Sequence, residues 1–202
     1  MAEIGLFPLG MVLLPGELVP LHIFEPRYKE LIGECLAEDH EFGLILSDEQ
    51  GLRSTGTRAR VVDVLERFDD GRLNIVVRGG ERFRLRNLTS GRSFQTGDVE
   101  PLEDADQPPS EDERARVRQL YERLADVAGE EVEELADGPE LSFAVASRVD
   151  FGVEIKQKLL EQRSESTRLG YLAGLLETAA EALARAEERR RRAQGNGSAP
   201  LG

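Results

Sequence analysis

Proline and glycine divide the first apolar stretch of the chain into pieces that are too short for anything but strands and turns. This stretch, Phe7–Tyr28, reads FPLGMVLLPGELVPLHIFEPRY. Proline cannot donate a hydrogen bond to a strand ladder and glycine weakens a strand interior, so both favour strand ends and sheet edges. We therefore predict three short strands, over Ile4–Phe7, Val12–Leu14 and Leu18–Phe24.

A helix is predicted directly after these strands. Pro26 suits the first turn of a helix, because its missing N–H would have no partner there. Apolar residues then follow at helical spacing, at Tyr28, Leu31, Ile32, Cys35 and Leu36. One face of this helix is therefore expected to pack on the sheet.

Further strand patterns complete a β-rich half of the chain, at Phe42–Leu46, Ala59–Phe68, Arg72–Arg78, Arg82–Leu88 and Phe94–Val99. Asp69-Asp70-Gly71 lies between two alternating runs and predicts a hairpin, because glycine supplies the positive φ that such a turn requires. One helix among many strands indicates a small barrel or a curled sheet.

The hydrophobic period changes to that of helices after an acidic segment that contains Pro108 and Pro109. Ser110 and Glu113 have the spacing of a capping box, so a helix is predicted from about Glu111. Three more helices are predicted: one that starts at Pro139, one around Ile155–Leu160 and a long one through Leu169–Leu183 that ends in the basic run Arg189–Arg192.

These patterns predict an α+β protein with two parts. We expect a β-rich subdomain over residues 1–102, an acidic linker over 103–112, a helical subdomain over 113–190 and a disordered tail over 191–202. The four helices are expected to bury their apolar stripes against one another or against the barrel.

Charge restricts the class of partner. The net charge is −13, whereas a general nucleic-acid binder needs clustered Lys and Arg for phosphate contacts. Fourteen acidic residues and four arginines lie between Glu100 and Asp137. This segment is either a solvated face that keeps the protein soluble or a docking site for a basic partner.

Residue types that carry chemistry are scarce. With His22, His40 and Cys35 as the only histidines and cysteine, none in a spaced motif, we expect no metal site and no cofactor. Cys35 lies on the apolar face of the first helix, which favours a buried hydrophobe over a nucleophile. The N-terminus has no basic region before its proline-interrupted apolar stretch, which indicates neither a signal peptide nor a spanning helix and suggests a cytoplasmic protein.

Several of these segments together resemble the N-terminal, substrate-binding domain of the Lon protease family. They are the stretch from Phe7, Gly56-Thr57-Arg58-Ala59, the hairpin at Asp70-Gly71-Arg72, Gly80-Glu81-Arg82-Phe83-Arg84, and Lys156–Glu161 followed by Arg168-Leu169. The resemblance extends to about Glu187. It implies a PUA-like pseudo-barrel with one helix, followed by a C-terminal helical bundle, and a non-catalytic role in recognising peptides or partly unfolded proteins.

Members of that family carry an ATPase and a Ser-Lys peptidase, and neither is expected here. A phosphate-binding loop needs glycine before its lysine, whereas Tyr28, Ile155 and Gln157 precede Lys29, Lys156 and Lys158. Only a short tail follows the helical part. We therefore expect a free-standing, non-enzymatic member of the family, and the excess of Arg over Lys suggests a GC-rich, bacterial genome.

Two groups of residues are candidates for peptide binding. The first consists of exposed aliphatic positions in the broken strands, which could offer apolar surface and strand edges: Leu13, Leu14, Leu18 and Val19. The second is the turn formed by Glu25, Arg27 and Tyr28, where a charge pair and an aromatic ring could line a groove. The alternative for this turn is that Glu25 caps the helix, Arg27 is surface and Tyr28 is core.

Two other functions stay open at this point. The protein could be an adaptor or regulator that docks on a dedicated protein partner through its acidic helical part. It could also be a nucleic-acid-binding module of the PUA-like type, although its charge disfavours this.

Overall fold

The computed structural model describes residues 2–105, 108–132, 135, 138 and 140–195. Six strands and five helices lie within these residues: β1 Ala2–Leu9, β2 Leu18–Ile23, α1 Pro26–Glu38, β3 Phe42–Asp48, β4 Gly51–Arg67, β5 Leu73–Thr89, β6 Thr96–Pro101, α2 Glu111–Ala128, α3 Leu141–Ala146, α4 Val153–Glu161 and α5 Glu165–Gly195. The α+β class is confirmed.

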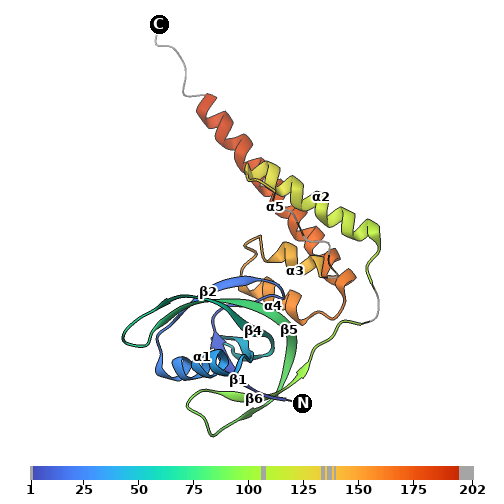
Figure 1. Ribbon diagram of the computed structural model, residues 1–202. Helices are drawn as coiled ribbons and strands as arrows, with labels where there is room; N and C mark the ends of the chain where they lie inside the picture. Colours follow the sequence, from blue (N-terminus) through green and yellow to red (C-terminus); the bar gives the residue numbers. More distant parts are fainter. Residues whose placement is uncertain (1, 106–107, 133–134, 136–137, 139, 196–202) are drawn as a thin grey trace. The chain divides into compact units, whose positions relative to one another are not determined.

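The chain forms two compact units. One comprises Met1–Ala105 and Phe143–Arg163, and the other comprises Asp106–Ser142 and Ser164–Gly202. The first unit holds all six described strands with α1 and α4, while α2 and α5 belong to the second (Figure 1).

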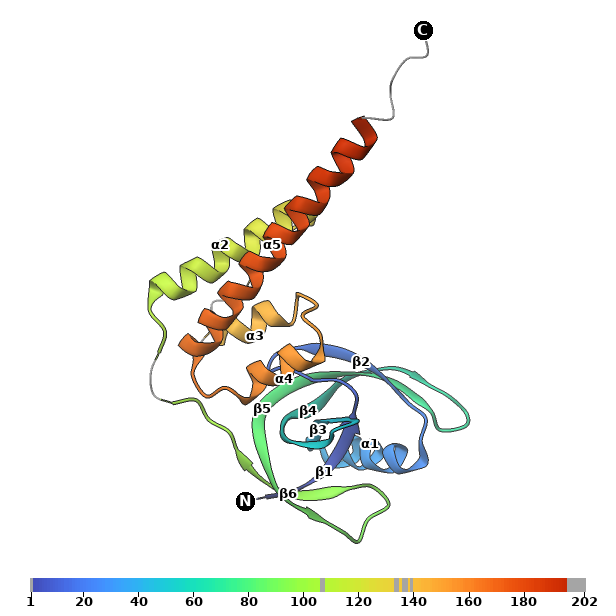
Figure 2. The same ribbon diagram turned by 180° about the vertical axis from the view of Figure 1, so that it is seen from behind.

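The six strands of the first unit form a barrel. Their order is β2-β5-β4-β3-β1-β6, and an additional pairing of β5 with β6 closes a ring of five strands that leaves β2 outside it. Of the pairings among the described strands, that of β1 with β3 is parallel and the others are antiparallel. Figure 2 shows the curvature of the long strands β4 and β5 around α1. The ladder between β4 and β5 shifts register three times, once with the extra residue on β5 and twice with it on β4, and such bulges increase the bending of a sheet.

The strand β5 replaces the two strands that the sequence predicts over Arg72–Arg78 and Arg82–Leu88. Gly79 and Gly80 do not end the strand, although the ladder shifts register beside them: Gly79 pairs with Ala59 of β4, and the next pair joins Arg82 to Thr57. A Cβ atom on Gly79 would lie 2.1 Å from the carbonyl oxygen of Leu14, so glycine serves here to let another segment approach the strand. The hairpin before β5 is confirmed, with Gly71 at φ +80°.

The segment that approaches Gly79 is the one for which the sequence predicts a strand over Val12–Leu14, and this prediction is wrong. These residues are irregular, and Leu13 and Leu14 are fully buried. The Thr57 hydroxyl donates a hydrogen bond of 2.6 Å to the Leu13 carbonyl, and the Glu17 carboxylate accepts one of 2.8 Å from the Leu14 N–H. Local bonds and side-chain donors thus replace the ladder bonds that a strand would have made.

The predicted apolar face of α1 is confirmed. Tyr28, Leu31, Ile32 and Cys35 are buried in the main core of the barrel. The ring of Tyr28 lies 3.9 Å from that of Phe7, measured between centroids. This packing holds α1 against the sheet that surrounds it.

Helix α4 belongs to the barrel unit, although the sequence assigns it to a helical subdomain over 113–190. Lys156 of α4 forms an ion pair of 2.8 Å with Glu17. Arg82, which is 5% exposed, donates to the carbonyls of Leu160 at 2.9 Å and Gln162 at 2.6 Å. The guanidinium thereby binds carbonyls at the C-terminal end of α4 that have no partner within a helix, so polar contacts as well as apolar ones decide where this helix packs.

The second unit contains the confirmed capping box of α2. The Ser110 hydroxyl accepts from the Glu113 N–H at 3.3 Å, and the Glu113 carboxylate accepts from the Ser110 N–H at 2.7 Å. The apolar stripe of α2 is buried, as is that of α5: Val117, Leu120, Tyr121 and Ala125, with Leu169, Leu172, Leu176 and Ala180. These stripes are the apolar core of this unit.

The C-terminal end of α5 differs from the prediction. Helix α5 continues through Gly195, so residues 191–195 are helical where the sequence predicts a disordered tail. Residues 196–202, Pro139 and residues 106–107 of the predicted linker lie outside the described residues.

Substitution Gly79→Ala is expected to destabilise the barrel unit by about 1–3 kcal/mol, because its methyl group would overlap the Leu14 carbonyl and overpacking costs this much. Urea unfolding followed by circular dichroism measures the loss, and hydrogen exchange of the β5 amides locates it. Gly33→Ala on the exposed face of α1, where a Cβ meets no atom within 4 Å, is the matched control and should not destabilise the protein. Equal stability of the two variants would contradict the close approach at Gly79.

Candidate functional site

Strand β2 has an unpaired edge. It pairs with β5 from Leu18 opposite Arg78 to Ile23 opposite Leu73, and no other described strand pairs with it. Pro20 lies in the middle of β2, which is where proline is tolerated because an edge strand needs fewer donors. An edge of this kind can accept a further strand from another chain.

The sheet formed by β2, β5 and the adjoining part of β4 has an inner and an outer face. Ile75 and Val77 of β5 lie in the core, so Val76 between them points outward. Val61 and Val64 both pack against the core although they are three residues apart, and the ladder shifts register between them. The bulge therefore turns both intervening residues, Val62 and Asp63, outward.

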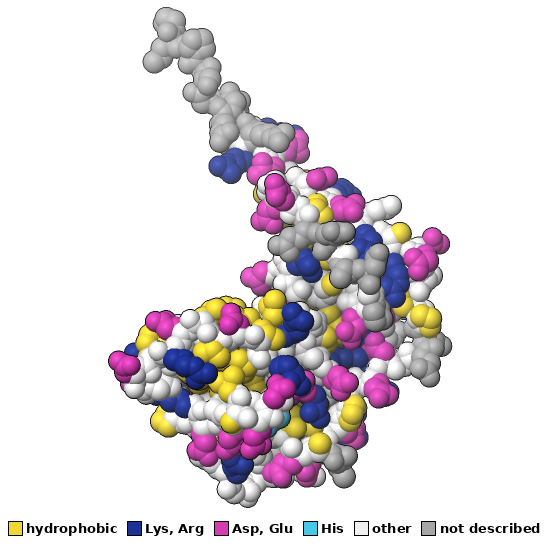
Figure 3. All heavy atoms as spheres, in the orientation of Figure 1, with side chains coloured by type: hydrophobic (Ala, Val, Ile, Leu, Met, Phe, Trp, Pro, Cys, Tyr) yellow, Lys and Arg dark blue, Asp and Glu magenta, His cyan; other side chains and the backbone are white. Residues whose placement is uncertain are grey.

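The outer face of these strands carries large apolar side chains. We call Leu18 and Pro20 of β2, Val76 of β5, and Val62 and Leu65 of β4 the outer apolar face. Leu18 is 52% exposed, Val62 45% and Leu65 58%. Figure 3 shows hydrophobic side chains gathered over this part of the barrel. Contiguous exposed apolar surface on a folded unit is typical of a binding site.

Aromatic rings extend the outer apolar face toward the β4–β5 hairpin. The His22 ring stacks on Phe24 with centroids 5.8 Å apart and meets Phe68 edge-on at 6.1 Å. Phe24 is 58% exposed, and the Arg72 guanidinium lies 4.8 Å from the Phe68 ring centroid. The Nδ1 atom of His22 lies 2.6 Å from the Asn74 side-chain oxygen, which orients the imidazole. The rings therefore form an ordered, partly open apolar surface.

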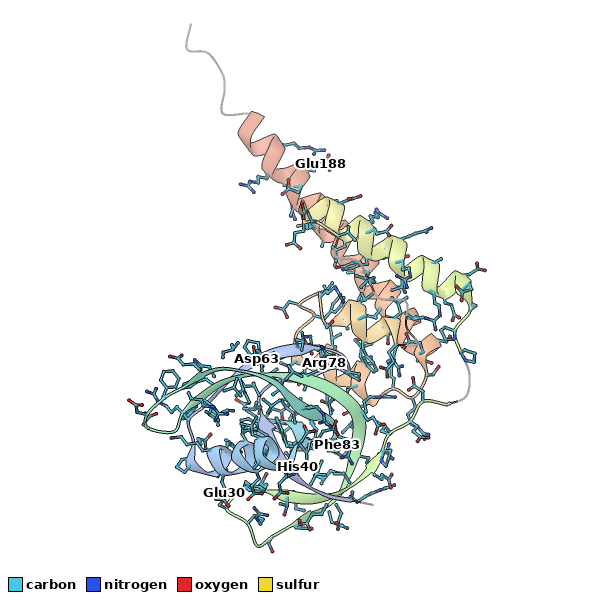
Figure 4. All side chains as sticks on the ribbon, in the orientation of Figure 1. Glu30, His40, Asp63, Arg78, Phe83 and Glu188 are labelled. Carbon is cyan, nitrogen blue, oxygen red and sulfur yellow. The ribbon has the colours of Figure 1, made fainter. Side chains whose placement is uncertain are left out.

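Charged side chains border this surface. Asp63 on β4 and Arg78 on β5 are exposed, and neither side chain forms an ion pair with any residue that the structure describes. Figure 4 labels both on the part of the barrel where β2, β4 and β5 lie. This rim therefore carries one charge of each sign that is not engaged in an ion pair within the described part of the chain.

The four aliphatic residues that the sequence suggests for peptide binding fall into two groups in the structure. Leu18 is exposed and Val19 is partly buried, both on the edge strand. Leu13 and Leu14 are 1% and 0% exposed, so the expectation that they offer apolar surface is wrong. The hydrogen bond from Thr57 to the Leu13 carbonyl and the close approach of Gly79 to the Leu14 carbonyl hold Leu13 and Leu14 in the core.

The turn at the start of α1 mostly matches the alternative in which Arg27 is a surface residue and Tyr28 belongs to the core; the side-chain cap expected from Glu25 is not formed. Glu25 is the N-cap residue of α1 without a side-chain capping bond, and it pairs instead with Arg27 at 2.9 Å. The Arg27 guanidinium lies 4.5 Å from the ring centroid of Tyr28, which is core. Burial raises the pKa of the Tyr28 hydroxyl. Glu25 and Arg27 therefore stay at the surface, while Tyr28 does not.

Sequence reasoning missed Phe24, Val62 and Leu65 as surface residues. Each lies in an apolar stretch that was assigned to a strand, and strand periodicity alone places every second residue inside. The available signal was the pair of adjacent apolar residues at Val61-Val62 and at Val64-Leu65, which a regular alternation would separate. Two apolar neighbours in an otherwise alternating strand indicate a bulge.

Neither a metal site nor a membrane-spanning helix is found among the described residues. No group of three or more His, Cys, Asp and Glu residues among them could hold a metal ion. No helix within the described ranges is long and apolar enough to cross a membrane. Burial raises the pKa of the Cys35 thiol to about 12, so this side chain is a buried hydrophobe at neutral pH.

A small barrel with an unpaired edge strand and an exposed apolar face has the features of a binding domain. The family model for the ATP-dependent protease La (LON) substrate-binding domain matches residues 3–178, so the chain belongs to this family. It is 27% identical to Lon protease 1 of Hydrogenovibrio crunogenus over 186 residues, which is 83% of this chain. It is 34% identical to the Lon protease of Parabacteroides distasonis over 110 residues, half of the chain.

Two solved structures share the fold. One is the Lon N-terminal domain protein from Xanthomonas campestris, with a TM-score of 0.68 at 25% identity over 86% of this chain and 98% of that one. The other is the N-terminal domain of the Mycobacterium avium complex Lon protease, with a TM-score of 0.69 at 21% identity over 87% of this chain and 98% of that one. The chain spans 23% and 13% of the two curated relatives, so the match concerns their substrate-binding part.

Cys35 is expected to react with a thiol reagent such as dithionitrobenzoate only when the barrel opens. The raised pKa keeps its thiolate fraction low at pH 8, and the side chain is 4% exposed. The measurement is the rate of labelling in buffer and in denaturing urea, with the urea reaction expected to be faster by orders of magnitude. Full labelling of the folded protein within seconds would contradict the burial of this thiol.

Proposed function

We propose that this chain recognises polypeptides that expose apolar side chains, and that it does so without catalysis or a cofactor. The observation that carries the proposal is the outer apolar face beside the unpaired edge of β2. Membership of the substrate-binding family supports a role in recognition. Unfolded or partly folded polypeptides are the partners that this surface fits, because they expose apolar side chains and unpaired backbone groups together.

The edge and the face would contribute in different ways. Backbone groups of β2 would pair with an extended segment, and because Pro20 lacks an N–H this pairing would be short. The outer apolar face would cover apolar side chains of the bound segment, each worth about 1.5–3 kcal/mol when fully buried. Ordering a flexible segment opposes this gain, so binding should be weak and tolerant of sequence.

Of the residues named from the sequence, Leu18 and Val19 are the ones we retain as peptide contacts, together with Val62, Leu65 and Phe24. Glu25 and Arg27 are retained as rim residues next to Phe24. No specific observation favours a dedicated folded partner on the acidic helices. The net charge of −13 also disfavours a nucleic-acid partner.

The double substitution Leu18→Asp and Val62→Asp is expected to weaken binding to apolar, unfolded-type peptides at least tenfold, because it places two charges on the outer apolar face. A peptide array followed by fluorescence anisotropy on the best binders measures this change. Leu88→Asp is the matched control: Leu88 is 54% exposed on β5, but beyond the part that pairs with β2. This variant should bind as the wild type does.

Circular dichroism must first establish that all variants fold. If the folded double variant binds as tightly as the wild type, the outer apolar face is not the site. If the folded wild type binds no peptide of the array, the proposed function is wrong, and a dedicated protein partner becomes the better interpretation.

A further inference from the structure

A cleft opens in the barrel where β1 and β3 separate. The two strands pair in parallel from Leu6 opposite Gly43 onward, whereas Ala2–Gly5 pair with β6 and with no other strand that the structure describes. Strand β3 begins at Phe42, and the residues before it connect the sheet to α1. The cleft has a volume of about 790 Å³ and is lined by the first residues of β1, the end of α1, the segment that leads into β3, and Arg58 and Arg60 of β4. His40, labelled in Figure 4, lies in that leading segment.

Backbone groups of β1 face this cleft. The Leu6 N–H donates to the Gln95 carbonyl at 2.7 Å, which places the backbone groups of Leu6 on the β6 side. Because residues of an antiparallel pair alternate in direction, Glu3 presents its N–H and C=O toward the opposite edge, and Gly5 presents its N–H there. No described strand pairs with that edge before Leu6.

The charges that line the cleft do not balance. It contains five carboxylates and three guanidiniums, those of Glu3, Glu34, Glu38, Asp39 and Glu41 with Arg58, Arg60 and Arg92. Arg60 lies 2.8 Å from Asp39, Arg92 pairs with Glu34, and Arg58 and Arg60 are within 4.0 Å of Glu41. This leaves two carboxylates, Glu3 and Glu38, that form no ion pair with an Arg or Lys among the described residues, although the charge of Arg92 contributes to lowering the pKa of Glu3.

These two carboxylates have only weaker neighbours. Glu38 lies 3.4 Å from His40 and its side chain is 73% exposed. Glu3 accepts a hydrogen bond of 2.7 Å from the Thr89 hydroxyl, and the hydrogen bonds with Thr89 and Thr96 hold the pKa of its carboxyl below the usual value, so it is ionised at neutral pH. The surplus negative charge is therefore available to a cation from outside the protein.

Part of the cleft lining is apolar. Leu31 and Phe94 lie close to the backbone of β1, and a Cβ atom on Gly5 would lie 2.3 Å from the Leu31 side chain and 3.0 Å from the Phe94 ring. Ile4 also lines the cleft. An occupant with alternating polar and apolar side chains would therefore match both surfaces.

We propose that this cleft binds an extended, basic segment of a polypeptide. The backbone of the segment pairs with Glu3 and with the Gly5 N–H, while a Lys or Arg side chain pairs with Glu3 and Glu38. This site is separate from the outer apolar face, and it offers negative charge where that face offers apolar side chains. A chain that carries both apolar and basic stretches could occupy the two sites at different points along its length.

The test uses a fluorescent, terminally blocked peptide of sequence Lys-Val-Lys-Val-Lys and its counterpart Glu-Val-Glu-Val-Glu, with binding measured by fluorescence anisotropy at low salt. The basic peptide should bind and the acidic one should not. The isosteric double substitution Glu3→Gln and Glu38→Gln should weaken binding of the basic peptide about fivefold or more, as expected for two partly exposed ion pairs. Equal binding of the two peptides, or no effect of the double substitution, would overturn the proposal.

A matched control removes the same charge elsewhere. Glu49→Gln with Glu122→Gln changes two exposed carboxylates that do not line the cleft, and should leave binding unchanged. An equal loss in this control would mean that only net charge matters, which would also overturn the proposal.

Strand pairing is tested on the wild-type protein with peptides that are N-methylated at alternate amides. One of the two methylation patterns should abolish binding, and unchanged binding of both would overturn the backbone contact. The Leu18→Asp and Val62→Asp variant separates this proposal from the proposed function. It should lose apolar peptides and keep the basic one, so each site can fail without the other.

Discussion

The change of partner along β5 is the constraint on which the barrel unit depends. Up to Arg78 this strand pairs with β2, and from Phe83 onward it pairs with β6, while β4 lies along its other edge. Gly79 lies between the two regions, where a Cβ atom would collide with the Leu14 carbonyl. The segment around Leu14 can therefore cross β5 between the residues that pair with β2, which begins at Leu18, and those that pair with β6.

Closure of the ring by β5 and β6 leaves two incomplete edges. Among the described strands, β2 lies outside the ring and pairs on one side, and the first half of β1 pairs with β6 but not with β3. The surroundings of the two edges differ in chemistry. Leu18, Val62 and Leu65 make the first apolar, whereas Glu3 and Glu38 give the second a surplus of negative charge. Two edges of one small sheet can thus serve different parts of an extended chain.

Local signals in the sequence were sufficient for several elements. Pro26 marks the start of α1, Gly71 the hairpin, and Ser110 with Glu113 the capping box of α2. The helix start, the hairpin and the capping box each depend on residues that are neighbours in the chain. Their sequence patterns can therefore be recognised without knowing the fold. The α+β class and the barrel follow from the same local periodicities, and the resemblance to the Lon substrate-binding domain led to the correct family.

The sequence by itself thus determined most of the elements and the family, because these depend on local spacing and residue type. Only the tertiary structure decided which apolar residues form surface. Leu14 and Leu18 are similar in sequence context, but the first is held in the core near Gly79 and Thr57 while the second lies on an open edge. It also decided that α4 joins the barrel, because Arg82 and Glu17, far away in the chain, supply the partners for this helix. Contacts between distant segments have no local pattern, and burial is determined by such contacts.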